Sequence, residues 1–414
     1  MSRVEGDAMH VIFVEPGFPA NQRQFVRALH AAGARITGIG ERPVEALGDE
    51  LRGWLHAYER VGNVCDEDAM TVAVRRVQKR ERADRLEATV EAHILPAAHV
   101  REACGIPGTS VRTAFLCRDK PAMKEALRAA GIPTARSTGA DDPEAARRFA
   151  REVGYPLIVK PRAAAGASGT VRVDDAAGLE RAIEGGRLGQ GGSVAIEEFV
   201  EGHEAFYDTL TIKGKVVHDF VSHYFPGVLE AMRTRWISPQ IVVTNRLDAS
   251  GYDEVKRMGQ SVVTALGIDT SATHMEWFFG PKGLKFSEIG CRPPGVGAWD
   301  LYCAANDFDL YLEWAHAIVH GRPQTRPSRR YSSGMIALRP DRDGRITGYE
   351  GVEAIQHRYG PWMIDMHLPP PGTPTQPVEA GYMANAWVRM KHPDYDQLRE
   401  MLDDVGRTLK VRAS

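Results

Sequence analysis

The sequence predicts a mixed α/β and α+β fold with a doubly wound α/β domain at its N-terminus and a small α+β domain at its C-terminus. Apolar runs at residues 11–14 and 36–39 flank an amphipathic helical segment at residues 21–32, as in half of a doubly wound domain. After residue 118, short strand patterns alternate with helices. The 414 residues correspond to two or three domains at ~100–200 residues each. We expect the domains to span residues 1–117, 118–325 and 326–414.

Composition excludes several classes of protein. Lys and Arg total 52 and Asp and Glu total 54, which gives a formal charge of −2, and 43% of the residues are hydrophobic. Without a basic run we expect no nucleic-acid partner, and no apolar run approaches the ~20 residues that span a membrane. Glu15 and Pro16 end the first apolar run too early for a signal peptide, so we expect a cytoplasmic protein. Five cysteines without a CxxC pair indicate neither a disulfide framework nor a zinc ribbon.

Three segments carry no clear chemistry. The first loop, EPGFPANQ, lacks the GxGxxG fingerprint, so we place no dinucleotide there. The charged helical segment from Asp66 to Arg101 is interpreted as solvated surface. Glu313, His316 and His320 share a helical face, but a solvated face is favoured over a metal site because one helix supplies no facing ligands.

The central and C-terminal elements are read in chain order. Asp119 is the expected N-cap of a helix that ends at Gly131. The following ranges are expected to be a helix at 143–153, strands at 157–161 and 170–173, three strands within 193–221, an irregular stretch at 225–250, a helix at 252–266 and two strands around 280–283. The last domain is expected to contain strands at 335–338 and 383–390 and a closing helix with Leu398, Met401, Leu402 and Val405.

The segment HMEWFFGPKGLKFSEIGCRPPG is a candidate metal hairpin. A three-residue loop, Pro281 to Gly283, with Gly283 in the left-handed conformation, places Glu276 directly opposite Glu288. Directly paired Cβ atoms lie ~4.5–5.5 Å apart, so two like charges destabilise the sheet unless a cation lies between them. Mg²⁺ is typically bound by one or two carboxylates together with phosphates.

The same register has further consequences. It pairs His274 with Gly290 and Phe278 with Phe286, and it leaves Arg292 within reach of the same phosphates. A two-residue loop would instead place the two glutamates on opposite faces, and the segment would then be an ordinary surface hairpin.

A second group of residues suits a nucleotide. Lys160 ends a strand before the small residues AAAGASG, where backbone N–H groups can approach an oligophosphate. In SVAIEEFVEGHE, backbone groups near the apolar residues suit adenine and an acid suits ribose. Alone, Lys160 could be a surface strand end and the second segment an acidic hairpin turn. The candidate residues of this group are Lys120, Lys160, Gly166, Ser168, Gly169, Glu197, Glu198, Phe199, Val200 and Glu204.

Taken in order, these motifs resemble the ATP-grasp superfamily, specifically carboxylate-amine ligases of the L-amino acid ligase type. Asp119 and Lys120 match the family's DK, and Lys160 before Gly166, Ser168 and Gly169 matches its strand lysine and flap. Glu197, Val200 and Glu204 match the hinge and ribose acid; Glu276 and Glu288 match the magnesium acids; Glu288, Arg292 and Gly295 match E-x-x-x-R-x-x-G. Many members carry Asn where this chain has Gly290, so a second magnesium could have one protein ligand fewer.

The resemblance implies ATP and Mg²⁺ or Mn²⁺ as cofactors, and a small-molecule carboxylate and amine as substrates. The γ-phosphoryl group would pass to the carboxylate, and the amine would attack the acyl phosphate. Residues 163–169 would close as a flap, and Arg292 and Gly295 belong to the catalytic signature. His274 could orient a substrate or take a proton, and a purely structural histidine is an equal alternative.

Several questions stay open at this stage. Arg233 and Arg235 could bind a substrate carboxylate, although a solvated loop is favoured. A homodimer is compatible with the sequence. Two alternatives to the ligase are an ATP-grasp carboxylase that acts through carboxyphosphate and a nucleotide-binding protein without turnover. Lys124 lies inside a predicted helix, which argues against a biotin-carrier lysine at that position.

Overall fold

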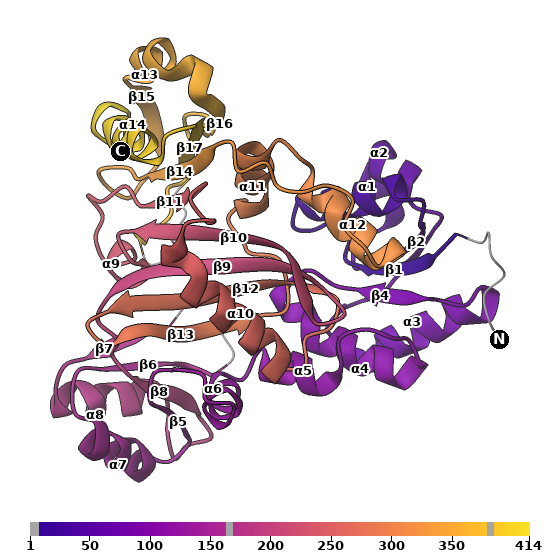
Figure 1. Cartoon of the computed structure of the whole chain (residues 1–414), viewed down its shortest axis with the longest axis horizontal. Coiled ribbons are helices and arrows are strands. Elements are labelled where there is room, and N and C mark those ends of the chain that lie inside the picture. The colour runs from indigo at the N-terminus through magenta and orange to yellow at the C-terminus, as the bar shows by residue number, and fades with distance from the viewer. Residues whose placement is uncertain (1–7, 163–168, 379–384) are drawn as a thin grey trace.

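The N-terminal part of the computed structural model is an α/β unit (Figure 1). The structure describes residues 8–162, 169–378 and 385–414. Four parallel strands have the order β3-β2-β1-β4, as a doubly wound unit requires. The strands are β1 His10–Val14, β2 Arg35–Gly40, β3 Ala57–Arg60 and β4 Arg85–Glu87, and the helices are α1 Gln22–Ala31, α2 Asp49–Trp54, α3 Glu67–Arg80, α4 Ile94–Cys104 and α5 Val111–Leu116.

A small antiparallel sheet follows, with the strand order β5-β8-β6-β7. Asp119 caps the helix that precedes it: its side chain accepts a hydrogen bond from the Ala122 N–H, and Pro121 occupies the first turn. The elements are α6 Lys120–Ala129, β5 Ser137–Ala140, α7 Pro143–Val153, β6 Leu157–Pro161, β7 Val171–Val173, α8 Ala176–Gly185 and β8 Val194–Glu198.

The largest layer is an eight-stranded sheet with the order β13-β12-β9-β10-β11-β14-β17-β16. It continues without a break across the predicted domain boundary at residue 326, because β11 pairs with β14. Its strands are β9 His203–Ile212, β10 Lys215–Phe225, β11 Gln240–Val243, β12 Ser271–Gly280, β13 Gly283–Gly290, β14 Ser332–Leu338, β16 Met363–His367 and β17 Ala386–His392.

Helices and a two-stranded sheet complete the fold. β15 (Ile346–Glu350) pairs with β18 (Lys410–Ala413) near the C-terminus. The remaining helices are α9 Val228–Ala231, α10 Asp253–Ala265, α11 Ala298–Asn306, α12 Leu310–His320, α13 Val352–Tyr359 and α14 Tyr395–Thr408. The short 3₁₀ turns are η1 Val44–Leu47, η2 Glu91–His93, η3 Ser250–Tyr252 and η4 Gly360–Trp362.

Two expectations about these elements are wrong. The stretch at residues 225–250 is not irregular throughout, because β11 lies inside it and all four of its residues are buried. The face of α12 that carries Glu313 and His316 is not solvated, since these residues are only 3% and 6% exposed. Glu313 accepts hydrogen bonds from His218 and from the backbone N–H groups of residues 324 and 325. These contacts give Glu313 a structural role.

A shared apolar core fixes the N-terminal domain against the large sheet. The cluster contains Phe13 and Phe25 of the first domain together with Trp299 and Trp314 of α11 and α12. The ring centroids of Phe25 and Trp314 lie 5.1 Å apart with their planes nearly perpendicular, which is a favourable aromatic contact. This core therefore holds the first domain beside the sheet that carries the two glutamates.

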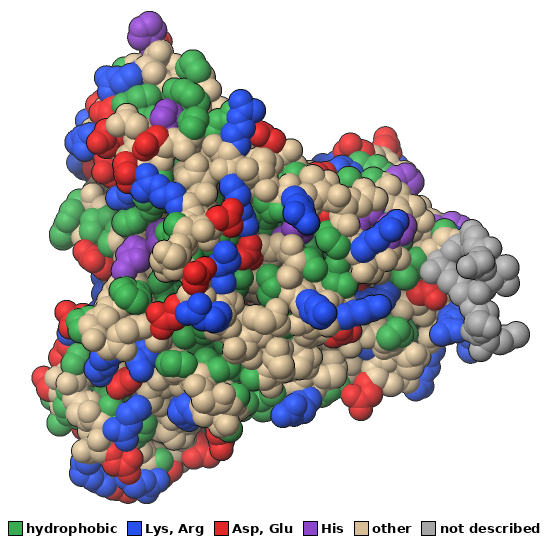
Figure 2. Space-filling view, viewed as in Figure 1, with side chains coloured by type: hydrophobic (Ala, Val, Ile, Leu, Met, Phe, Trp, Pro, Cys, Tyr) green, Lys and Arg blue, Asp and Glu red, His purple; other side chains and the backbone are tan. Residues whose placement is uncertain are grey.

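The surface agrees with the balanced charge of the sequence. On the face shown in Figure 2, acidic, basic and hydrophobic side chains are interspersed. Across the described ranges, no helix has both the length and the apolar character needed to cross a bilayer.

Candidate active site

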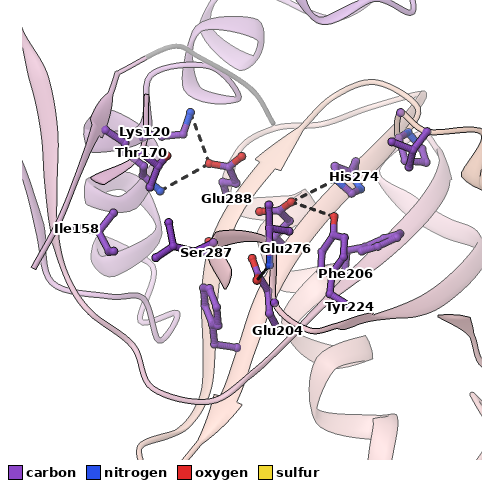
Figure 3. A pocket seen from close by; sticks show the side chains of 18 of the residues that line it. Lys120, Ile158, Thr170, Glu204, Phe206, Tyr224, His274, Glu276, Ser287 and Glu288 are labelled. Carbon is purple, nitrogen blue, oxygen red and sulfur yellow. Dashed lines mark hydrogen bonds and ion pairs between the residues drawn. The ribbon is translucent and has the colours of Figure 1, made fainter. Parts of the chain in front are cut away.

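A cavity of about 1070 Å³ lies between the small antiparallel sheet, β5-β8-β6-β7, and the eight-stranded sheet. Its wall includes residues of three regions that are far apart in the sequence, and Figure 3 shows part of it. The lining includes Asn21, Gln22, Thr89 and Glu91 of the first domain, Lys120, Lys124, Lys160 and Arg172 near the small sheet, and Glu204, Tyr224, Arg233, His274, Glu276, Glu288, Arg292 and Gly295.

The two glutamates lie opposite each other, as expected, but for a different reason. Gly280 pairs with Gly283, so the loop contains two residues rather than three, and Phe278 faces Lys285 rather than Phe286. Between Trp277 and Glu276 the register shifts by one residue, because Ser287 is an extra residue on β13. This bulge restores the pairing of Glu276 with Glu288.

The rest of the hairpin matches the expected geometry. His274 pairs with Gly290, and Gly283 has φ +74°, in the left-handed region. A Cβ atom at Gly290 would lie 3.2 Å from a carboxylate oxygen of Glu91. Glycine therefore leaves room for Glu91 beside the carboxylate pair.

Both candidate lysines lie beside Glu288. Its Oε2 is 3.5 Å from Nζ of Lys120 and 3.7 Å from Nζ of Lys160. Lys120 starts the helix α6 and Lys160 lies near the end of the strand β6, so the two ammonium groups reach the cavity from different elements. Figure 3 shows Lys120 beside Glu288. Burial lowers the pKa of Lys160, but the negative charges of Glu197 and Glu288 outweigh it, and the net pKa is raised.

Glu197 lies between two buried ammonium groups. Its Oε1 is 2.6 Å from Nζ of Lys124 and its Oε2 is 3.0 Å from Nζ of Lys160. Burial raises the pKa of Glu197, but the two lysines reverse this and bring it to about 2. Burial lowers the pKa of Lys124 to about 8 despite its contact with Glu197. Lys124 is absent from the sequence-based candidates because a lysine inside a helix gives no signal of burial.

His274 is held by a network behind the cavity wall. Its Nδ1 lies 2.7 Å from Oδ1 of Asp208, and its Nε2 lies 3.6 Å from Oε1 of Glu276. Burial lowers the pKa of His274, but Asp208 and Glu276 raise it to about 9 overall. Burial raises the pKa of Glu276, whereas its contacts with His274, Lys160 and Arg292 lower it, and the net shift is downward. Glu276 is therefore ionised near pH 7.

The hinge segment also lines the cavity. Phe199 and Val200 are among its lining residues, and the Arg172 guanidinium lies 4.3 Å from the centre of the Phe199 ring. Glu198 also lines the wall. Glu204 accepts a hydrogen bond of 2.7 Å from the Val228 N–H. Burial and the charge of Glu276 raise the pKa of Glu204 to about 8.

Arg292 depends on a residue that the sequence analysis assigned to solvated surface. Its Nε donates a hydrogen bond of 2.6 Å to Oε2 of Glu91, and both residues line the cavity. Burial lowers the pKa of Arg292, but the Glu91 charge raises it above its ordinary value. The interpretation of residues 66–101 as a segment without chemistry is therefore wrong at Glu91, which only the docking of the first domain brings to the site.

The remaining candidate residues lie at different places in the structure. Arg233 lines the cavity, whereas Arg235 does not and instead forms an ion pair of 2.6 Å with Asp343. Gly295 lines the cavity, and Gly169 has φ +69°. Gly166 and Ser168, like most of the expected flap, lie outside the described residues.

Comparison with known proteins agrees with this geometry. The ATP-grasp domain family matches residues 125–308. An L-arginine-specific L-amino acid ligase of Bacillus subtilis is 28% identical over 307 residues, which cover 72% of this chain and 73% of that protein. The crystal structure of an L-amino acid ligase from Bacillus licheniformis has a TM-score of 0.77 at 17% identity and covers 98% of this chain and 99% of that one. An N5-carboxyaminoimidazole ribonucleotide synthetase from Thermotoga maritima has a TM-score of 0.70 at 18% identity, covering 98% and 100%.

These findings show the family of the central domain and the fold of the chain. The chain contains an ATP-grasp domain and has the ATP-grasp fold. It is similar in sequence to the L-arginine-specific L-amino acid ligase of Bacillus subtilis and in fold to the L-amino acid ligase of Bacillus licheniformis.

Proposed function

We propose that the protein is an ATP-dependent ligase that joins a carboxylate to an amine through an acyl phosphate. The observation that carries this proposal is the meeting of two opposed glutamates with lysines from the smaller sheet layer in one cavity. Lys120, Lys160 and Arg292 supply positive charge where a triphosphate would lie. Phosphoryl transfer depends chiefly on such positioning and charge stabilisation.

The donor set fits a divalent cation. Glu276 and Glu288 are hard carboxylate ligands on the cavity wall, and Glu276 is ionised. Among the residues that the structure describes, no group of three or more His, Cys, Asp or Glu side chains is arranged to hold a metal ion. In the proposed site the two glutamates would hold Mg²⁺ or Mn²⁺ together with phosphate oxygens. When bound, the cation would neutralise phosphate charge.

The proposed reaction has two steps. A carboxylate oxygen of the substrate attacks the γ-phosphorus, the bond to the bridging oxygen breaks, and ADP leaves. The amine nitrogen next attacks the acyl carbon, the C–O bond to phosphate breaks, and the nitrogen loses a proton. The hinge residues, Phe199 and Val200, offer apolar contact to adenine, and Glu204 is the proposed acceptor for ribose hydroxyls.

The experiment is ADP and phosphate release measured with ATP, Mg²⁺ and pairs of L-amino acids. Release that requires an added amine, together with trapping of the activated acid by hydroxylamine as a hydroxamate, supports the ligase. Dependence on bicarbonate supports a carboxylase, and no turnover with any pair supports a nucleotide-binding protein. Glu276→Gln should abolish release, whereas Asp343→Asn, a matched acid outside the cavity, should not.

A further inference from the structure

Glu91 reaches the cavity from the first domain. It begins the 3₁₀ turn η2, shortly after β4, and it lines the cavity together with Thr89 and Val90. The strands of the first sheet are parallel, and ligand sites lie at the carboxyl ends of such strands. The first domain therefore supplies a carboxylate to the site that the central domain forms.

Both oxygens of the Glu91 carboxylate contact arginines. Oε2 accepts a hydrogen bond of 2.6 Å from Nε of Arg292, and Oε1 accepts one of 3.2 Å from Nη1 of Arg118. Arg118 also donates to the backbone oxygen of Glu91, and it directly precedes Asp119 and Lys120 at the start of α6. Glu91 therefore connects the segment before α6 to the arginine that follows β13.

Two contacts hold the plane of the Arg292 guanidinium. Its Nε donates to Glu91, and its Nη1 donates a hydrogen bond of 2.9 Å to the backbone oxygen of Pro293. A guanidinium has five N–H donors in a rigid planar fork, so these two contacts set the direction of the other donors. Because Arg292 lines the cavity, the other donors are the ones that can contact phosphate oxygens.

Glycine at position 290 leaves room for this ion pair. A Cβ atom there would lie 3.2 Å from Oε2 of Glu91 and 3.4 Å from Cγ of Arg292. Carbon atoms pack best at about 3.5–4.0 Å. A side chain at this position would therefore press on both partners and shift Arg292 away from Glu91.

We propose that Glu91 is a positioning residue for Arg292, which it holds in the orientation that contacts the transferred phosphoryl group. This inference rests on the proposed function. It makes the reaction depend on the docked first domain, because that domain supplies the acceptor for the Nε–H of Arg292. The alternative is that Glu91 binds the amine substrate directly, in which case its loss raises the KM for the amine.

The test is steady-state ADP release by the full-length protein with Mg²⁺, ATP and the pair of amino acids that gives the fastest release. Because a misplacement of ~1 Å can cost ~10²-fold in rate, Glu91→Gln should lower kcat ~10–10²-fold and leave the KM for the amine unchanged. Glu59→Gln is the matched control and should keep kcat. Glu59 is an acid of the same domain that pairs with Arg76 and Arg80 outside the cavity lining.

Two further variants show whether Glu91 acts through Arg292. In a double-mutant cycle, Glu91→Gln should lower kcat much less in the Arg292→Lys background than in the wild type, because the guanidinium that it positions is already gone. Gly290→Ala crowds the ion pair without removing a charge and should lower kcat severalfold. This variant decides the question if Glu91→Gln does not fold.

The outcomes separate this inference from the proposed function. Three results overturn the positioning role: unchanged kcat in both Glu91→Gln and Gly290→Ala, a raised KM for the amine with kcat retained, or equal losses of kcat in the wild-type and Arg292→Lys backgrounds.

If the wild type releases no ADP with any pair, the proposed function fails. Calorimetric affinity for the β,γ-imido analogue of ATP with Mg²⁺ then decides the role of Glu91, because a misplaced guanidinium weakens phosphate binding. Weaker binding by Glu91→Gln and Gly290→Ala, but not by Glu59→Gln, supports the positioning role. Equal binding by these variants and the wild type overturns it.

Discussion

The ionised, buried carboxylate of Glu197 should stabilise the folded state by several kilocalories per mole. It is 5% exposed and lies between the ammonium groups of Lys124 and Lys160. Its pKa falls from 4.5 to about 2. Because each pKa unit corresponds to ~1.4 kcal/mol, ionised Glu197 stabilises the folded state by about 3 kcal/mol, and Glu197→Gln should lower the free energy of unfolding at pH 7 by this amount.

The pH dependence of this effect has a definite sign. A carboxylate whose pKa is lowered by folding contributes its full stabilisation above its unfolded pKa, here 4.5, and loses it as the pH falls towards about 2. The difference in unfolding free energy between wild type and Glu197→Gln should therefore be constant near pH 7 and shrink below pH 4.5. Lys124, whose pKa is lowered to about 8, offsets part of the gain because its burial costs free energy.

Urea denaturation of the wild type and the variants measures these values. Glu198→Gln is the matched control, since its carboxylate contacts the exposed Lys282 ammonium at 3.4 Å and the backbone N–H of Arg136, and it should cost less than about 1 kcal/mol. The double variant Lys124→Met with Glu197→Gln should lose less than the sum of the single losses. A loss below 1 kcal/mol for Glu197→Gln, or strict additivity, would refute the reasoning.

Three further outcomes are expected. Arg233→Ala should raise the KM for the carboxylate substrate severalfold, whereas Arg235→Ala, outside the cavity, should leave KM unchanged in the same ADP-release assay. Arg292→Lys should lower kcat by ~10²-fold, because the ammonium group cannot replace the planar fork of the guanidinium; unchanged kcat would contradict its role. Gly259→Ala should lower the urea midpoint by the equivalent of ~1–3 kcal/mol, since its Cβ would lie 2.3 Å from the buried Tyr207 ring.

The sequence predicted the elements whose signals are local. The N-cap at Asp119, the helix at 143–153 and the strand at 157–161 each depend on residues within a few positions, and each is present in the structure. The parallel unit at the N-terminus also follows from alternating apolar and amphipathic segments. By contrast, β11 has only four residues and gave no separate signal.

The hairpin shows how a correct prediction can rest on an incorrect detail. The expected pairing of Glu276 and Glu288 came from a three-residue loop, whereas the structure has a two-residue loop and a bulge at Ser287. Each change alters the register by one residue, and the two cancel. A bulge depends on how a strand packs against the rest of the sheet, and the hairpin residues alone do not reveal it.

The amino-acid sequence alone determined which kinds of side chain form the candidate site: opposed carboxylates, lysines at element ends and a hinge with apolar residues. Only the tertiary structure decided that Glu91, Lys124 and Asp208 join them, because their partners Arg292, Glu197 and His274 lie 201, 73 and 66 positions away along the chain, respectively. Their contacts form when separate sheets and the first domain dock. Burial then sets the pKa values, since a charged side chain inside a protein must find its partner among residues that the chain brings from far away.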